Sequence, residues 1–135
     1  MTIQQKIIEL QDQIDALKAE AQVPVPERFD WENAPVICEL NGYGWLLGQE
    51  ADEELNWADA KAWCQSVGGE LPPRDILLQC YMNEDIKLLF RKDWYWSGTE
   101  FLATGAWKQN FGNGNQASTY IAYNIYVRAV RKYPI

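Results

Sequence analysis

The order of the periodic segments after residue 36 limits the possible fold more than any other feature of the chain. Two apolar runs, residues 36–40 and 44–47, flank the pair Asn41-Gly42, and an Asn-Gly pair between apolar runs is a strong signal for a β-hairpin. Two helical patterns follow, and the rest of the chain has the period of strands. Because strands and helices do not alternate, we expect an α+β domain without a parallel sheet of βαβ units.

The helices of this domain have identifiable starts. Asn56 is expected to cap the first helix, with Asp59 three residues on as in a capping box, and Gly68 is expected to end it. The expected buried face has the spacing i, i+3, i+4, i+7, and consists of Ala60, Trp63, Cys64 and Val67. A second helix is predicted over residues 74–81, directly after two prolines, and a further short helix over residues 84–90.

The second half of the domain is predicted to consist of strands. They are expected over residues 94–97, 106–111 and 120–131, with a tight turn at residues 112–115. Large aromatic rings supply much of the buried area of a small domain. We therefore assign three tryptophans of this region to the core, namely Trp94, Trp96 and Trp107.

The first 22 residues have the pattern of a coiled coil. They contain no glycine or proline, and apolar residues recur at alternating spacings of four and three, at Ile3, Ile7, Leu10, Ile14, Leu17 and Ala21. This pattern predicts self-association as a dimer or trimer, and the alternative is an amphipathic helix that packs on its own domain. The predicted organisation is a coiled-coil helix over residues 1–22, a proline-containing linker over 23–35 and one domain over 36–135.

Five motifs of the domain resemble one protein family in their order and spacing. They are residues 57–64 (WADAKAWC), 69–76 (GELPPRDI), 96–100 (WSGTE), 106–114 (AWKQNFGNG) and 127–131 (VRAVR). Together they resemble the C-type-lectin-like domains of bacteria and phages, in particular the Lcl C-terminal-like family and its relatives among phage tail-fibre and diversity-generating variable proteins. The resemblance implies a C-type-lectin-like fold, with an N-terminal hairpin, two helices and a strand-rich second half. It also implies a ligand surface in the C-terminal region.

The chain departs from this family at positions that carry chemistry. Ala129 stands where members often have a cysteine, so the resemblance leaves Cys64 without the usual disulfide partner on the last strand. The Glu-Pro-Asn and Trp-Asn-Asp signatures of calcium-dependent sugar binding are absent. No cysteine follows Cys80, so the redox pair of the formylglycine-generating relatives is absent too. Neither of these activities is expected.

The sequence also lacks the residue sets that catalysis, metals and cofactors require. It has no histidine, which removes the commonest general base and metal ligand. The acidic run at residues 52–54 lacks the spaced oxygen ligands of a calcium loop, and Cys64 and Cys80 have no second pair with which to bind zinc. No glycine-rich loop of the phosphate-binding kind is present. We therefore expect a non-enzymatic protein without a metal or cofactor.

Charge and cysteine content indicate where the chain acts. Its 19 acidic and 12 basic residues give a net charge of −7, which disfavours direct contact with nucleic acid. No apolar window is long enough to predict membrane insertion, and the first residues lack the pattern of a secretion signal. Three cysteines cannot all pair within one chain, which favours a reduced compartment. We expect the protein in the host cytoplasm or in a virion.

The candidate ligand surface lies in the C-terminal region, where tyrosines alternate with short polar side chains of the kind that adaptable binding surfaces use. The candidate ligand-binding residues are Lys108, Asn110, Asn113, Asn115, Gln116, Thr119, Tyr120, Tyr123, Asn124 and Tyr126. The alternative is that the tyrosines pack the sheet and the asparagines only form turns.

These observations favour a homo-oligomeric binding protein encoded by a phage or prophage, whose C-type-lectin-like head recognises a host protein or a surface receptor. One alternative is a small intracellular phage protein that binds and inhibits a host defence or replication protein. Another is a structural module of virion assembly.

Overall fold

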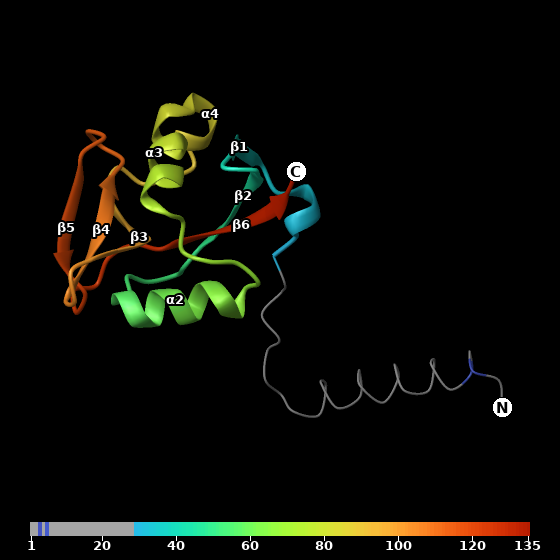
Figure 1. Cartoon of the computed structure of the whole chain (residues 1–135), viewed down its shortest axis with the longest axis horizontal. Helices are drawn as coiled ribbons and strands as arrows, with labels where there is room; N and C mark the ends of the chain where they lie inside the picture. Colours follow the sequence, from blue (N-terminus) through green and yellow to red (C-terminus); the bar gives the residue numbers. More distant parts are fainter. Residues whose placement is uncertain (1–2, 4, 6–28) are drawn as a thin grey trace.

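The computed structural model describes residues 3, 5 and 29–135. The predicted coiled-coil seam therefore lies outside the described residues except at Ile3, and the oligomerisation helix stays a prediction. The elements that the structure describes are η1 (Trp31–Asn33), β1 (Val36–Leu40), β2 (Tyr43–Glu50), α2 (Trp57–Ser66), α3 (Arg74–Met82), α4 (Glu84–Lys87), β3 (Trp94–Phe101), β4 (Gly105–Asn110), β5 (Gln116–Tyr120) and β6 (Arg128–Pro134). The α+β class is confirmed (Figure 1).

Two antiparallel sheets of three strands organise the domain. The first has the order β1-β2-β6, so the last strand of the domain pairs with its first hairpin, and the second has the order β3-β4-β5. In Figure 1, α2 lies on one side of β6, and α3 with α4 lies on the other. The helices α2, α3 and α4 and the whole second sheet are therefore inserted between β2 and β6 in the sequence.

Two hydrophobic cores lie on opposite sides of the last strand. Ala129 packs in one cluster with Ala60 and Cys64 of α2, whereas the next residue, Val130, packs in the other cluster with residues of α3. Successive side chains of a strand point to opposite faces, so β6 contributes to both cores with neighbouring residues. The tryptophan predictions hold in part, because Trp96 is fully buried but Trp94 and Trp107 are only half-buried.

The local signals in the first half of the domain are confirmed. Asn41 and Gly42 both have positive φ angles, as the tight turn between β1 and β2 requires. The Asn56 side chain accepts a hydrogen bond from the backbone N–H of Asp59 at 2.9 Å, which is the predicted N-cap. Helix α3 starts at Arg74, directly after Pro73.

The strand predicted over residues 120–131 is wrong in its extent. Residues 116–120 form β5 and residues 128–134 form β6, while the segment between them crosses from one sheet to the other. Within it, Ile125 and Val127 are buried, and their backbone groups bond to Leu55 and Ala51 instead of to a strand ladder. A continuous apolar run has the same appearance in sequence whether it lies in a sheet or crosses a core.

Trp31, inside the predicted linker over residues 23–35, is packed on the domain. The indole N–H of Trp31 donates to the backbone oxygen of Val67 at 2.8 Å. Its ring lies so close to Gly48 and Gly69 that a Cβ at either glycine would come within 3.0 Å of ring atoms. Part of the predicted linker is therefore packed on the domain, which proline content and polarity alone did not indicate.

A buried tyrosine joins the two sheets. Tyr95 of β3 is fully buried, and its hydroxyl donates to Glu50 at the end of β2 while it accepts from the backbone N–H of Arg91 at 2.9 Å. The other oxygen of Glu50 accepts from Arg91 Nε at 2.9 Å. Burial, together with the bond to Glu50, raises the pKa of Tyr95.

We predict that Tyr95→Phe lowers the free energy of unfolding by about 1–3 kcal/mol, because Glu50 and the Arg91 N–H each lose a partner in a partly dry site. Urea titration followed by circular dichroism measures this. Tyr43→Phe is the control, since Tyr43 is exposed on β2. Equal midpoints for the two variants would contradict a structural role for the Tyr95 hydroxyl.

The three cysteines are free and differ in accessibility. Cys64 and Cys80 are fully buried, whereas Cys38 is half-buried. Burial raises the pKa of the Cys64 thiol to about 12, and burial also raises the pKa values of Cys80 and Cys38. The placement of Cys64 as a small core residue is confirmed.

Because the thiolate is the reactive form, a raised pKa and burial both slow alkylation. We predict that iodoacetamide at pH 8 modifies Cys38 first in the folded protein, and that Cys64 and Cys80 react only after urea unfolds the chain. Mass spectrometry of digested protein identifies the modified sites. Rapid modification of Cys64 or Cys80 without urea would contradict the packing of the two cores.

Candidate recognition surface

One face of the second sheet carries the side chains of the candidate site. Trp107 lies opposite Ser118 on the neighbouring strand, Gln109 lies opposite Gln116, and Gly105 lies opposite Tyr120. Directly opposed residues share a face of the sheet, and the next residues along each strand point to the other face. Trp107 and Tyr120 are therefore on one face, whereas Lys108 is on the other.

A hydrogen-bonded clamp connects this face to the start of α3. The Arg74 guanidinium donates to Gln116 Oε1 from Nε at 3.0 Å and from Nη2 at 2.8 Å. In return, Gln116 Nε2 donates to the backbone oxygen of Arg74 at 2.7 Å and to Oε1 of the buried Gln109 at 2.9 Å. The backbone N–H of Arg74 donates to Thr99 Oγ1 at 3.0 Å. The clamp fixes both the helix start and the guanidinium.

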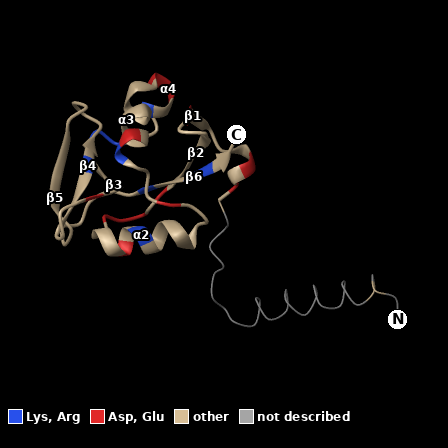
Figure 2. Ribbon diagram, viewed as in Figure 1, with Lys and Arg blue, Asp and Glu red and all other residues tan. Residues whose placement is uncertain are grey.

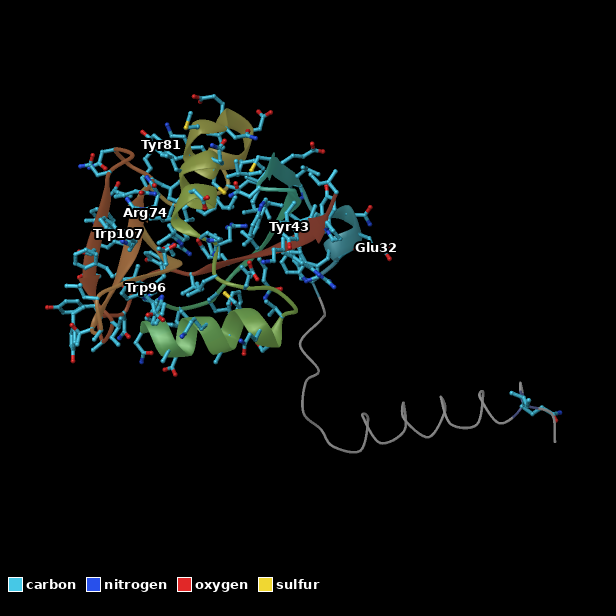
Figure 3. All side chains as sticks on the ribbon, in the orientation of Figure 1. Glu32, Tyr43, Arg74, Tyr81, Trp96 and Trp107 are labelled. Carbon is cyan, nitrogen blue, oxygen red and sulfur yellow. The ribbon has the colours of Figure 1, made fainter. Side chains whose placement is uncertain are left out.

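The clamped guanidinium lies over an aromatic ring. Arg74 Cζ is 3.6 Å from the centroid of the Trp107 ring, and Figure 3 shows the two side chains next to each other between α3 and β4. This distance is well within the range of a cation–π contact. Among the residues that the structure describes, no carboxylate lies within ion-pair distance of Arg74. The contacts of the guanidinium that the structure describes are to the neutral side chains of Gln116 and Trp107.

Further exposed rings continue the surface from Trp107. The ring of Phe101 contacts the ring of Trp107 edge-on, with 5.2 Å between the ring centroids. Phe101 and Tyr120 line the same shallow hollow of about 240 Å³. Tyr120 in turn contacts Tyr123 edge-on at 6.1 Å. Tyr120 is 53% exposed and Tyr123 is 60% exposed. We call these residues, Arg74, Phe101, Trp107, Tyr120 and Tyr123, the aromatic patch.

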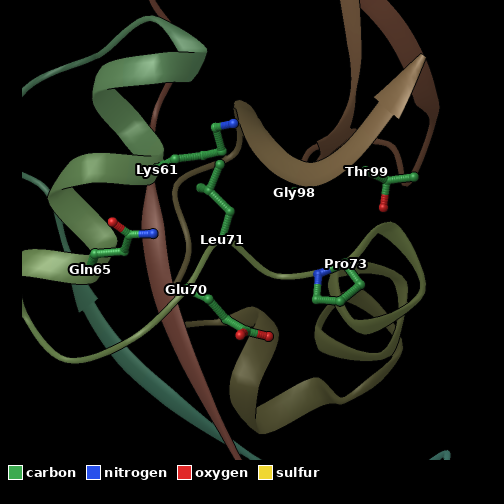
Figure 4. A pocket seen from close by; sticks show the side chains of 7 residues that line it. All are labelled: Lys61, Gln65, Glu70, Leu71, Pro73, Gly98 and Thr99. Atoms are coloured by element: carbon green, nitrogen blue, oxygen red, sulfur yellow. The ribbon is translucent and has the colours of Figure 1, made fainter. Parts of the chain in front are cut away.

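A polar cleft adjoins the aromatic patch at Thr99. It has a volume of about 350 Å³ and lies between α2, the α2–α3 connection and β3 (Figure 4). Its lining residues are Lys61, Gln65, Glu70, Leu71, Pro73, Gly98 and Thr99. The cleft offers hydrogen-bond donors and acceptors, and its lining includes a positive side chain, Lys61, and a negative one, Glu70. It can therefore extend the contact area of a ligand on the aromatic patch.

The predicted asparagines form the turn between β4 and β5. Asn110 Oδ1 accepts from the backbone N–H groups of Gly112 and Asn113, and Asn113 Oδ1 accepts from the N–H of Asn115. Side-chain bonds of this kind to the following backbone hold tight turns. Asn110 and Asn113 thus have a structural task, as the alternative interpretation of the sequence has it. The side chain of Asn115 is exposed.

The other predicted ligand residues are distributed over both faces and the core. Gln116 belongs to the clamp, and Tyr126 is half-buried with its ring 5.8 Å from Tyr95. Lys108 Nζ lies 4.2 Å from the centroid of the Trp94 ring on the opposite face, where burial lowers the pKa of Lys108. Thr119 is half-buried and Asn124 is exposed. The predicted set is therefore not one surface, and only Tyr120 and Tyr123 belong to the aromatic patch.

Sequence reasoning missed Arg74, Phe101 and Trp107 as surface residues. The sequence alone favours the core for Trp107, because it does not say which face of β4 a helix covers. The alternation along β4 was a usable signal, because the buried Ala106 and the half-buried Trp107 point to opposite faces. No sequence signal marks Arg74, since its role depends on a glutamine that is 42 residues away.

The described part of the chain contains no helix that is long and apolar enough to span a membrane. Within the same part, no group of three or more acidic, cysteine or histidine side chains is placed to hold a metal ion.

Comparison with known proteins yields little. No protein-family model matches the chain, and no curated protein matches its sequence. Among solved structures, the chain is similar to botrocetin, with 14% identity and a TM-score of 0.46 over 82% of this chain and 98% of that one. At this identity and score, the likeness identifies neither a family nor a function for the chain. The observed order of hairpin, helices and second sheet fits the C-type-lectin-like architecture that the sequence motifs imply.

We predict that Gln116→Ala destabilises the protein by about 1–3 kcal/mol, because the buried Gln109 oxygen and the Arg74 backbone oxygen lose their donor. Differential scanning calorimetry measures the change. Asn124→Ala is the matched control, an exposed amide of the same segment, and is expected to stay within about 0.5 kcal/mol of the parent. A parent-like unfolding profile for Gln116→Ala would show that the clamp does not hold α3 on the sheet.

Proposed function

We propose that this chain is a non-enzymatic binding protein of a phage or prophage, whose C-type-lectin-like head recognises a host protein through the aromatic patch. The observation that carries the proposal is the Arg74 guanidinium, which is bonded to Gln116 and lies over the ring of a half-buried tryptophan. A surface receptor on the host cell is the corresponding ligand if the protein is part of a virion. The N-terminal helix, through its predicted seam, would join two or three heads.

The composition of the aromatic patch supports protein recognition. Tryptophan, tyrosine and arginine are the residue types that dominate binding energy at protein interfaces. The clamp holds Arg74 in place before any ligand arrives, so less side-chain freedom is lost on binding. Phe101 and Tyr120 expose ring surface beside it, where water leaves when a partner docks.

The charge of the aromatic patch indicates the complementary ligand group. The chain is acidic overall, yet no carboxylate of the described residues forms an ion pair with Arg74 of the patch. A carboxylate of the partner would accept from the guanidinium N–H groups that Gln116 leaves free. The partner surface that fits best presents an acidic side chain next to apolar area.

One observation favours the intracellular version of this function. The three cysteines are unpaired, and two of them are fully buried as thiols. Such thiols are typical of proteins that act in a reducing compartment. In this version the bound protein is a host defence or replication factor, and binding inhibits it.

The proposal is tested by affinity capture from a host lysate with the full-length protein. Tyr120→Ala and Arg74→Gln are expected to weaken the capture of the specifically retained protein by roughly 30-fold each, the size of a hot-spot loss. Titration of that purified partner by surface plasmon resonance gives the affinities.

Tyr43→Ala is the control, because it removes an exposed tyrosine from the other sheet. Capture that survives Tyr120→Ala and Arg74→Gln but fails in Tyr43→Ala would place the binding site elsewhere and refute the role of the aromatic patch.

A further inference from the structure

The outer edge of β5 presents unpaired backbone groups. The N–H of Asn110 donates to the oxygen of Asn115 at 2.8 Å, and the N–H of Ile121 donates to the oxygen of Thr104 at 3.0 Å. Backbone groups of successive residues in a strand point to opposite sides, so Ala117 and Thr119 bond to β4 as well. The N–H and C=O groups of Gln116, Ser118 and Tyr120 therefore point away from β4.

Among the described residues, no strand pairs with this edge. In the described residues, no hydrogen bond reaches the backbone of Gln116 or Ser118 from outside the sheet, and only the N–H of Tyr123 bonds to the oxygen of Tyr120. β5 is the last strand in the order β3-β4-β5 and lies at the rim of the molecule in Figure 1. A free edge of this kind is a template for a further strand.

The other edge of the same sheet is covered. On β3, the N–H of Trp96 donates to the oxygen of Tyr126 at 3.0 Å, and the N–H of Gly98 donates to the oxygen of Pro72 at 2.8 Å. Both bonds come from loops that cross the edge and satisfy its donors. Within the described part of the chain, β5 is therefore the edge of the second sheet that is open to a further strand.

The edges of the first sheet carry features that block strand addition. On β6, Val130 exchanges two backbone hydrogen bonds with Glu70, and Pro134 ends the strand. On β1, the pairing is irregular between Val36 and Cys38, and Glu39 adds an exposed charge. Coverage, proline, bulges and charges are the means by which proteins protect sheet edges.

β5 has none of these protections. Its sequence, QASTY, contains no charge and no proline, and its pairing with β4 has no irregularity. The whole stretch between Lys108 and Arg128 is uncharged, in a chain in which 23% of residues are charged. In Figure 2, β5 and the turn before it carry neither colour of charge.

We propose that β5 pairs with β5 of a second copy of this chain, antiparallel and about a two-fold axis at Ser118. In this register Ser118 faces its own copy, and Gln116 faces Tyr120 of the other copy. Gln116 and Ser118 point free backbone groups to the seam and Tyr120 adds its N–H, so roughly four interchain hydrogen bonds form without the Tyr120 oxygen that Tyr123 uses. The two sheets become one continuous sheet.

The charge distribution favours a second copy as the occupant. A two-fold axis brings the residue on the axis against its own copy, so a charge at position 118 would face a like charge. A chain with net charge −7 can therefore meet its own copy most readily at an uncharged edge. The pairing buries less area than a standard interface, so it is weak and depends on concentration.

Pairing at β5 has a consequence for the aromatic patch. Antiparallel strands in one sheet keep the same face on the same side, so both copies of Trp107 and Tyr120 lie on one side of the joined sheet. Two ligand sites that face the same way raise avidity without new contacts. The pairing itself does not depend on the proposed function.

Amide hydrogen exchange of the full-length protein, measured residue by residue by NMR, tests the proposal. The amides of Ser118 and Tyr120 are expected to exchange about threefold more slowly, or more, as the protein concentration rises a hundredfold, because the seam protects them only when it is formed. Ala117 and Thr119 bond to β4 and are the internal controls. Ser118 and Tyr120 amides that exchange like unstructured ones at every concentration would overturn the proposal.

A pair of substitutions at one site separates pairing from folding. Ser118→Lys places two like charges at the two-fold axis and is expected to abolish the protection of the Tyr120 amide, whereas Ser118→Ala retains it. Another contact could hold the two copies together at all concentrations. The protection of the Tyr120 amide from exchange would then not change with concentration in the parent, but it would still be lost in Ser118→Lys. Protection that persists in Ser118→Lys would show that something other than β5 covers this edge and would refute the pairing.

Discussion

The clamp between Arg74 and Gln116 is the interaction on which the arrangement of the recognition surface depends. Gln109 is fully buried in the second sheet, and a buried amide has to be hydrogen-bonded. Gln116 supplies the donor from the neighbouring strand and uses its remaining groups on Arg74. The polar requirement of one buried residue thereby fixes the first residue of α3. It also fixes the guanidinium over Trp107. The recognition surface is thus positioned by the same hydrogen bonds that satisfy the buried Gln109.

The closure of the first sheet makes this clamp possible. Because β6 pairs with β2, the helices and the second sheet form one long insertion whose two ends are joined. Neighbouring residues of β6, Ala129 and Val130, anchor α2 and α3 on opposite sides. Tyr95 and Glu50 then connect the two sheets through a partly buried hydrogen bond. α3 is thus held at both sheets, and its first residue reaches β5 at a defined place.

Short-range signals in the sequence were sufficient for the first half of the domain. The Asn-Gly turn, the Asn56 cap and the proline before α3 act through neighbouring residues, so their chemistry can be recognised directly. The candidate surface could be predicted only in part, because Tyr120 and Tyr123 are exposed but Gln116, Tyr126 and Lys108 are occupied by contacts from distant residues. Pairing across 42 residues, as between Arg74 and Gln116, leaves no local pattern. The start of β6 could not be predicted for the same reason, since Ile125 and Val127 bond to residues far away in the sequence.

The central claim is that Arg74 is fixed over Trp107 before any ligand binds, and the side-chain Nε–H signal of Arg74 in a ¹H–¹⁵N NMR spectrum of the free protein tests it most directly. A guanidinium that donates from Nε to Gln116 and lies on an indole ring is expected to show a slowly exchanging Nε–H. Its proton shift should be moved by the ring, and Trp107→Leu should remove that displacement. A fast-exchanging Nε–H with the shift of a solvent-exposed arginine would contradict the account.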